Sequence, residues 1–84
     1  MPYEIRFKKS AFKEIEKLPT LVQNNITLAI AQLANNPRPS GCKKLQSSHV
    51  YWRIRSSDYR IIYTIEDKVL FIEIIKVAHR REVY

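Results

Sequence analysis

The stretch that decides the fold runs from Val50 to Glu66 and reads VYWRIRSSDYRIIYTIE. Two runs rich in aromatic and β-branched residues, 50–55 and 59–66, flank the segment Ser56-Ser57-Asp58, which is short enough for a hairpin turn. Such a pattern predicts a β-hairpin. Residues 69–77 have the same character and follow a second short connection, so a third strand is expected. A short strand over 43–47 is predicted before them.

The N-terminal half has a different pattern. Alternation of apolar and charged residues over 3–8 predicts a half-buried strand. Ser10 is expected to cap a short helix that Pro19 interrupts, and a second helix carries an apolar stripe from Val22 to Leu33. The order β-α-α-β-β-β in a single domain, 1–84, indicates an α+β fold. We expect a twisted antiparallel sheet with both helices packed on one face and the other face free.

Charge gives the first functional indication. The chain has 15 basic and 8 acidic residues, a formal net charge of +7. The excess is uneven, because only Asp58 is acidic among residues 38–60, a segment that contains Arg38, Lys43, Lys44, Arg53, Arg55 and Arg60. Scattered surface lysines need no partner, but a block this one-sided favours a polyanion.

Strand alternation sorts these residues by face. Tyr51, Arg53 and Arg55 share one face of their strand. Arg60 opens the next strand just across the turn from Arg55, so the hairpin is predicted to bring three arginines into one patch. Any single arginine on an open sheet face is often only solvated, but converging guanidiniums favour a bound anion.

The C-terminal segment, 78–84, adds further chemistry. It follows the last predicted strand directly, so His79, Arg80 and Tyr84 are expected near the sheet edge. They supply an imidazole, a guanidinium and a phenol. The alternative is a frayed basic tail.

Several other classes of protein are disfavoured. Two histidines and one distant Cys42 give no zinc-ligand spacing, and a single glycine excludes a glycine-rich phosphate loop, so we expect neither metal nor cofactor. No apolar run is long enough to cross a bilayer, and the N-terminus lacks the layout of a signal peptide. With one cysteine, the sequence predicts a cytoplasmic protein without membrane contacts.

The hairpin residues YWRIR (51–55) and DYRIIY (58–63) resemble the central hairpin of the RelE/ParE toxin superfamily. The segments YEIRF (3–7), KLP (17–19), NPRP (36–39), KKL (43–45) and HRREVY (79–84) also look like that family. The resemblance covers essentially the whole chain in the right order, and it implies a RelE-like fold.

The superfamily includes RNA-cleaving RelE members and ParE members that poison DNA gyrase. Similarity to RelE implies a ribosome-dependent mRNA endoribonuclease that inhibits translation by cutting mRNA in the ribosomal A site without metal. Attack of the ribose 2′-OH on the adjacent phosphate would leave a 2′,3′-cyclic phosphate and a 5′-OH. A ParE-like gyrase inhibitor and a non-enzymatic RNA-binding module remain as alternatives.

The resemblance also implies site residues. It places Arg53, Arg55, Arg60, Arg80 and Tyr84 in the catalytic site, with Arg60 and Arg80 on the phosphate. RelE toxins carry lysines in the strand where Arg53 and Arg55 stand, and arginine cannot lose its proton. Proton transfer is therefore expected from Tyr84 or His79, with Glu82 as a third candidate. Contacts with ribosomal RNA are expected from Arg38, Lys43, Lys44 and Arg81.

A toxin of this family implies an antitoxin. We expect an acidic antitoxin segment to fold over the toxin and cover Arg53, Arg55 and Arg60 in a toxin–antitoxin hetero-oligomer.

Overall fold

The chain folds into two helices and one five-stranded sheet, and the computed structural model describes residues 2–81. The elements are β1 (Glu4–Phe7), α1 (Lys9–Glu16), α2 (Thr20–Leu33), β2 (Lys43–Gln46), β3 (Val50–Ser56), β4 (Tyr59–Glu66), the single turn of 3-10 helix η1 (Asp67–Val69) and β5 (Phe71–His79). The predicted order β-α-α-β-β-β is confirmed with one more strand, because the short strand expected over 43–47 also forms and four strands follow the helices; the element ends are shifted by one or two residues.

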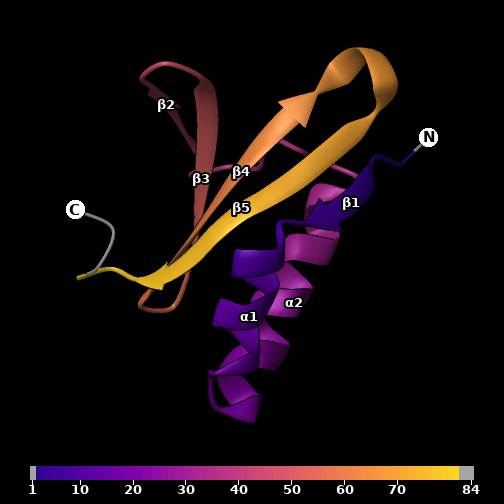
Figure 1. The fold of residues 1–84 in the computed structure, drawn as a ribbon. Helices are drawn as coiled ribbons and strands as arrows, with labels where there is room; N and C mark the ends of the chain where they lie inside the picture. The colour runs from indigo at the N-terminus through magenta and orange to yellow at the C-terminus, as the bar shows by residue number, and fades with distance from the viewer. Residues whose placement is uncertain (1, 82–84) are drawn as a thin grey trace.

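The sheet has the strand order β1-β5-β4-β3-β2. Strands β2 to β5 form the predicted antiparallel meander, but β1 pairs with β5 in parallel, with Ile5 opposite Ile72. The sheet is therefore mixed rather than wholly antiparallel. The reason lies in the path of the chain: it leaves β1 through the helices, starts again at the far edge, and returns strand by strand until β5 runs in the direction of β1 (Figure 1).

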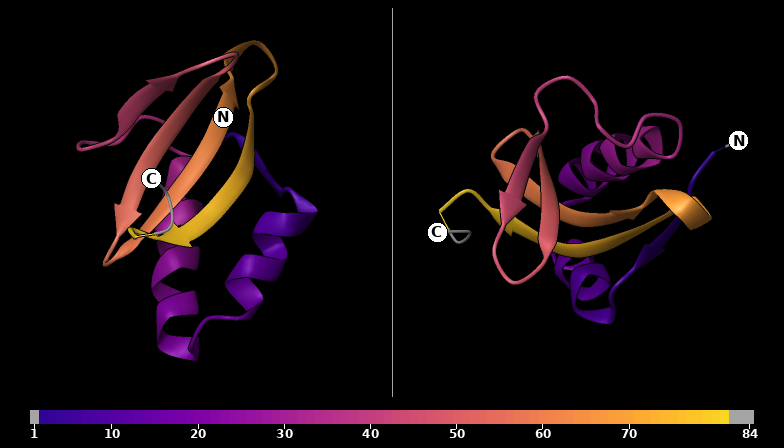
Figure 2. Two further views of the ribbon diagram at one scale, coloured as in Figure 1. Left: turned by 60° about the vertical axis from the view of Figure 1, so that its left-hand side comes forward. Right: turned by 90° about the horizontal axis from the view of Figure 1, so that it is seen from above.

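Both helices lie on the same side of the twisted sheet (Figures 1 and 2). The predicted apolar stripe of α2 is confirmed, since Ile26, Ile30 and Leu33 are buried. They form one core with α1 and with the inward side chains of the sheet: Ala11, Ile15, Ile54, Ile61, Tyr63, Ile72, Ile74 and Val77. The opposite face of the sheet is left without a helix in residues 2–81.

The helix hairpin is fixed by a side chain that the sequence pattern did not identify. Helix α1 starts after Lys8 without a side-chain cap, so Ser10 lies inside the first turn and its predicted capping role is wrong. Gln23 of α2 donates its amide N–H groups to the carbonyl oxygens of Leu18 at 2.8 Å and Glu16 at 3.2 Å. These bonds satisfy carbonyls that the end of α1 leaves without a helical partner.

A bulge in β5 connects the sheet to α1. Ile62 lies opposite Lys76 and Tyr63 opposite Ile74, so β5 has one extra residue at this point. Just after the bulge, the Val77 N–H donates to a carboxylate oxygen of Glu14 on α1 at 3.0 Å, and Lys76 pairs with the other oxygen at 3.3 Å. These contacts hold the C-terminal half of β5, and therefore the end that carries Arg80, against the helices.

A candidate anion-binding site on the open face of the sheet

The arginine patch predicted from the hairpin is present. Arg55 on β3 lies directly opposite Arg60 on β4, and Arg53 lies two residues before Arg55 in β3. Because Ile54 and Ile61 point into the core, the arginines next to them, Arg53, Arg55 and Arg60, point to the face without helices. Three guanidinium side chains from one hairpin therefore share the open face.

Two of these arginines are buried, which is unusual for this residue type. Arg53 is 5% exposed and Arg60 8%, whereas Arg55 is exposed. One Arg60 guanidinium nitrogen donates to the carbonyl oxygen of Arg80 at 3.4 Å. The patch thus combines two largely immobilised charges with one that solvent can reach.

The patch borders a small hollow of about 90 Å³ at the end of the hairpin. Its walls come from the β3–β4 turn and from the residue after β5: Arg55, Ser57, Asp58, Tyr59, Arg60 and Arg80. Three of these six residues are arginines from three different segments. We call this space the arginine hollow. Three arginines that line one hollow suit a phosphate, because a guanidinium can bind a phosphate with two hydrogen bonds.

Arg80 is held at the hollow by Asp58, a residue that the sequence analysis counted only as an opposing charge. The Arg80 N–H donates to the Asp58 carbonyl oxygen at 2.8 Å, and the Arg80 guanidinium lies 3.8 Å from the Asp58 carboxylate. The preceding residue, Ser57, has a φ of 58°, in the region that favours glycine. Asp58 stands in the turn between Arg55 and Arg60, and this position was the feature of the sequence that could have identified it as a site residue.

His79 lies on the other face. Its ring packs edge-on against Tyr59, with centroids 5.4 Å apart, in a depression lined by Glu14, Lys17 and Leu18 from the helix side. His79 and Arg80 therefore point to different faces, because adjacent residues of a strand point to opposite faces. Arg81 is exposed and donates its backbone N–H to His79 Nδ1 at 3.3 Å. Glu82 and Tyr84 lie outside the described residues.

The four residues expected to contact ribosomal RNA are separated by the structure. Lys43 lies opposite Arg53 and so joins the open face. Lys44 and Arg38 instead lie over the ring of Trp52, at 5.9 and 4.8 Å from its centroid. Trp52 packs against the core, so these two cations belong to the helix side.

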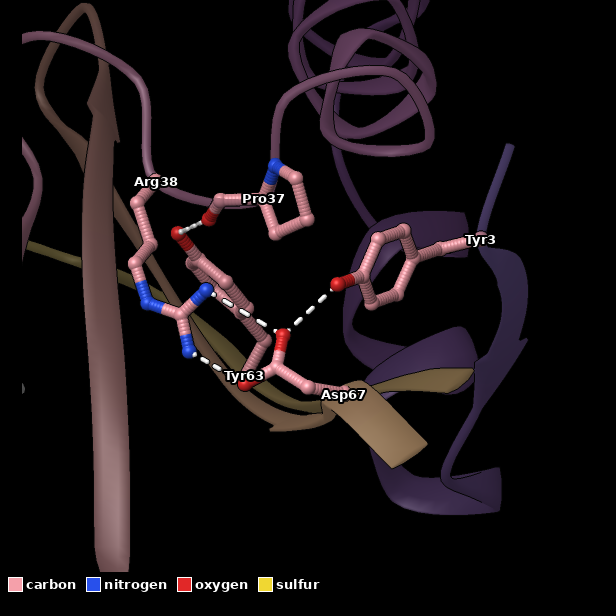
Figure 3. Close-up of polar contacts among 5 residues, drawn as sticks. All are labelled: Tyr3, Pro37, Arg38, Tyr63 and Asp67. Carbon is pink, nitrogen blue, oxygen red and sulfur yellow. Dashed lines mark hydrogen bonds and ion pairs between the residues drawn. The ribbon is translucent and has the colours of Figure 1, made fainter. Parts of the chain in front are cut away.

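Arg38 is also part of a cluster that the sequence pattern did not reveal. Its guanidinium donates to both carboxylate oxygens of Asp67, at 3.2 and 2.8 Å, and the Tyr3 hydroxyl donates to the same carboxylate at 2.6 Å (Figure 3). The Arg38 guanidinium, and then the Tyr3 hydroxyl, lower the pKa of Asp67. The hydrogen bond to Asp67 raises the pKa of Tyr3. Since these partners are 64 and 29 residues apart from Asp67, local patterns carry no signal for the cluster.

Within residues 2–81, no group of three or more His, Cys, Asp or Glu side chains could hold a metal ion. In the same part of the chain, no helix has the length and apolar character needed to span a membrane.

Comparison with known proteins gives the family. Residues 5–84 match the family model described as the ParE toxin of the type II toxin–antitoxin system parDE. The chain is 30% identical over 87 residues to the mRNA interferase toxin RelE of Escherichia coli, which covers all of this chain and 92% of that protein. It is 28% identical to toxin RelG of Mycobacterium tuberculosis, covering all of this chain and 98% of that toxin.

Solved structures agree with these relatives. The archaeal RelE–RelB complex from Pyrococcus horikoshii contains a chain that superposes with a TM-score of 0.86 at 26% identity, covering 99% of this chain and all of that one. The RelBE2 toxin–antitoxin complex of Mycobacterium tuberculosis gives 0.82 at 27% identity, with 95% of this chain and all of that chain covered. The fold, the family model and the relatives together show that this chain belongs to the RelE/ParE family of type II toxin–antitoxin toxins.

Proposed function

We propose that this chain is a ribosome-dependent mRNA endoribonuclease, the toxin of a toxin–antitoxin pair. The observation that carries the proposal is the arginine hollow, where Arg55, Arg60 and Arg80 surround one phosphate-sized space on the face without helices. A relative that is named an mRNA interferase and is matched over the whole of this chain supports the same activity.

The chemistry fits what arginines supply. Attack of a ribose 2′-oxygen on the adjacent phosphorus forms the 2′,3′-cyclic phosphate, and the bond from phosphorus to the 5′-oxygen breaks. Negative charge builds up on the phosphoryl oxygens between these two events. Arg60 is buried and the Arg80 backbone N–H is bonded to Asp58, so both arginines already stand at the hollow before RNA binds. Losing one such preorganised donor typically costs about 10²–10³ in rate.

Proton transfer needs other groups. The 2′-OH must lose a proton and the leaving 5′-oxygen must gain one, but a guanidinium stays protonated at any working pH. Because His79 faces the helix side, we assign the role of base for the 2′-OH to Tyr84, on the resemblance to RelE toxins, and the leaving 5′-oxygen takes its proton from water. Replacing Tyr84 by Phe is expected to slow cleavage without weakening RNA binding.

The partners follow from the charge of the open face. We propose that an acidic antitoxin segment covers Arg53, Arg55 and Arg60, as part of a hetero-oligomer, and competes there with RNA. The matched structures are toxin–antitoxin complexes of relatives, which supports an antitoxin for this chain. When the antitoxin is absent, the ribosome would orient the A-site codon against the arginine hollow. The exposed residues Arg81 and Lys43 would contact RNA. We place this activity in the cytoplasm.

A second candidate is inhibition of DNA gyrase. It is favoured by one observation, namely that the matching family model is described as a ParE toxin. In that case the arginine patch would be a docking surface for protein, without cleavage chemistry.

One experiment separates these functions. Purified toxin, free of antitoxin, is added to ribosomes programmed with a defined mRNA, to the same mRNA without ribosomes, and to a gyrase supercoiling reaction. The proposal predicts cuts only on the ribosome, with 5′-OH and 2′,3′-cyclic phosphate ends. Intact mRNA together with lost supercoiling would establish the gyrase function, and RNA binding without either effect would indicate a non-enzymatic module.

A further inference from the structure

A second and larger hollow lies at the outer edge of β3. The ladder between β2 and β3 ends at the pair Lys43–Arg53, so the rest of β3 extends past β2 beside helix α2. The space there is about 500 Å³. Its polar wall comes from α2, from the loop before β2 and from the two strands: Gln32, Ser40, Lys43, Arg53 and Arg55. We call it the edge hollow.

The edge hollow has the chemistry of an anion site. Its charged lining residues within the described part of the chain are all cationic: one lysine and two arginines. Gln32 and Ser40 add neutral groups that can hydrogen-bond to a sugar hydroxyl or a phosphate oxygen. Gly41, with a φ of 89°, also lines the space, and nothing lies within 4 Å of where its side chain would begin. A bulky polyanionic group therefore has both room and partners.

Arg55 connects the two hollows, because it lines the arginine hollow and the edge hollow alike. A nucleic-acid strand with one phosphate in the arginine hollow would reach the edge hollow across this side chain. We infer that the edge hollow is a second substrate subsite, which holds a neighbouring ribose-phosphate unit of the same RNA strand, with Lys43 as its main charge contact. The inference rests on the proposed ribonuclease function and extends it.

The subsite makes a prediction about RNA length. A dinucleotide has one phosphodiester and occupies only the arginine hollow, whereas a longer strand also reaches the edge hollow. For single-stranded RNA, the slope of log affinity against log salt concentration steepens by about 0.7 for each phosphate contact. Occupation of the edge hollow should therefore tighten binding and steepen the salt dependence once the strand is long enough.

The test compares wild type with Lys43→Gln and with the matched control Lys44→Gln. Lys44 is the next residue and loses the same charge, but its side chain lies over Trp52 on the other face. Binding of fluorescent RNA oligonucleotides from two to six nucleotides is measured by anisotropy at several salt concentrations. A 2′-deoxy sugar at the bond to be cut prevents cleavage. In Lys43→Gln, longer oligonucleotides should no longer bind more tightly than the dinucleotide, and the slope of log affinity against log salt should fall by about 0.7. The affinity for the dinucleotide should stay that of wild type. Lys44→Gln should keep both the gain in affinity with RNA length and the salt slope of wild type.

Three results would overturn the inference. A gain with length in Lys43→Gln equal to that of wild type would show that RNA does not use the edge hollow. An equal loss in Lys44→Gln would reduce the effect to overall charge. A Lys43→Gln protein that loses affinity only for an antitoxin peptide would assign the hollow to the antitoxin. Failure of the proposed function is read separately, from mRNA that stays intact on programmed ribosomes, whatever the oligonucleotides show.

Discussion

Replacing Tyr63 by Phe removes one oxygen from the centre of the molecule and leaves the ring. Tyr63 is fully buried, and its hydroxyl donates to the carbonyl oxygen of Pro37 at 2.7 Å (Figure 3). This bond ties the loop that follows α2 to the middle strand β4. The same loop leads into β2 and includes Gly41 at the edge hollow.

The expected cost follows from the hydrogen bond. A buried intramolecular hydrogen bond contributes about 0.5–1.5 kcal/mol net, and a carbonyl left without its donor adds to the loss. We therefore expect the free energy of unfolding to fall by about 1–2 kcal/mol. For a domain of this size, each kcal/mol lowers the Tm by roughly 4–8 °C.

Urea and thermal unfolding followed by circular dichroism measure this loss. The matched control is Tyr3→Phe, which deletes the solvent-exposed hydroxyl bound to Asp67 and should cost less. Burial also raises the pKa of Tyr63. Its folded-state advantage is therefore complete below about pH 10 and is lost as pH rises toward the folded value, a loss that Tyr63→Phe should lack. Wild-type stability in Tyr63→Phe, or an equal loss in Tyr3→Phe, would refute the reasoning.

Three further predictions concern the turn, the Asp67 cluster and the antitoxin. Ser57→Gly should raise the free energy of unfolding by up to about 1 kcal/mol, because its φ of 58° is unfavourable for serine; a loss in urea titrations would contradict this. The pKa of Asp67 is lowered, so wild type should be more stable than Asp67→Asn above about pH 4, and this advantage should disappear as pH falls through the folded value. A difference in Tm between wild type and Asp67→Asn that stays constant down to pH 2 would contradict this prediction. The proposed antitoxin complex should weaken as salt rises in titration calorimetry, and an affinity indifferent to salt would argue against an electrostatic interface.

Local patterns were sufficient for much of the fold. Two runs rich in aromatic and β-branched residues located the hairpin, and the short turn between them predicted that Arg55 and Arg60 lie across from each other, as the strand register confirms. The apolar stripe of α2 also identified its buried face. These features depend on residues close in sequence, so their periodicity is visible in the sequence alone.

Long-range contacts could not be predicted in this way. The parallel pairing of β1 with β5 joins residues 67 positions apart, since Glu4 lies opposite Phe71. Arg38 has the charge of an RNA-binding residue, but the Asp67 carboxylate engages it. His79 and Arg80 are adjacent in the sequence, but neighbours in an extended chain point to opposite faces. Charge and position in the sequence alone therefore do not show which of these residues lie together.

The central claim is that guanidinium groups at the arginine hollow drive cleavage of mRNA on the ribosome. The most direct measurement is the initial cleavage rate on programmed ribosomes for wild type, Arg80→Gln and the matched control Arg6→Gln, whose side chain pairs with Glu4 on β1, at the opposite edge of the sheet from β2. We predict a rate about 10²–10³ lower for Arg80→Gln and an unchanged rate for Arg6→Gln. Wild-type cleavage by folded Arg80→Gln, or an equal loss in both variants, would contradict the account.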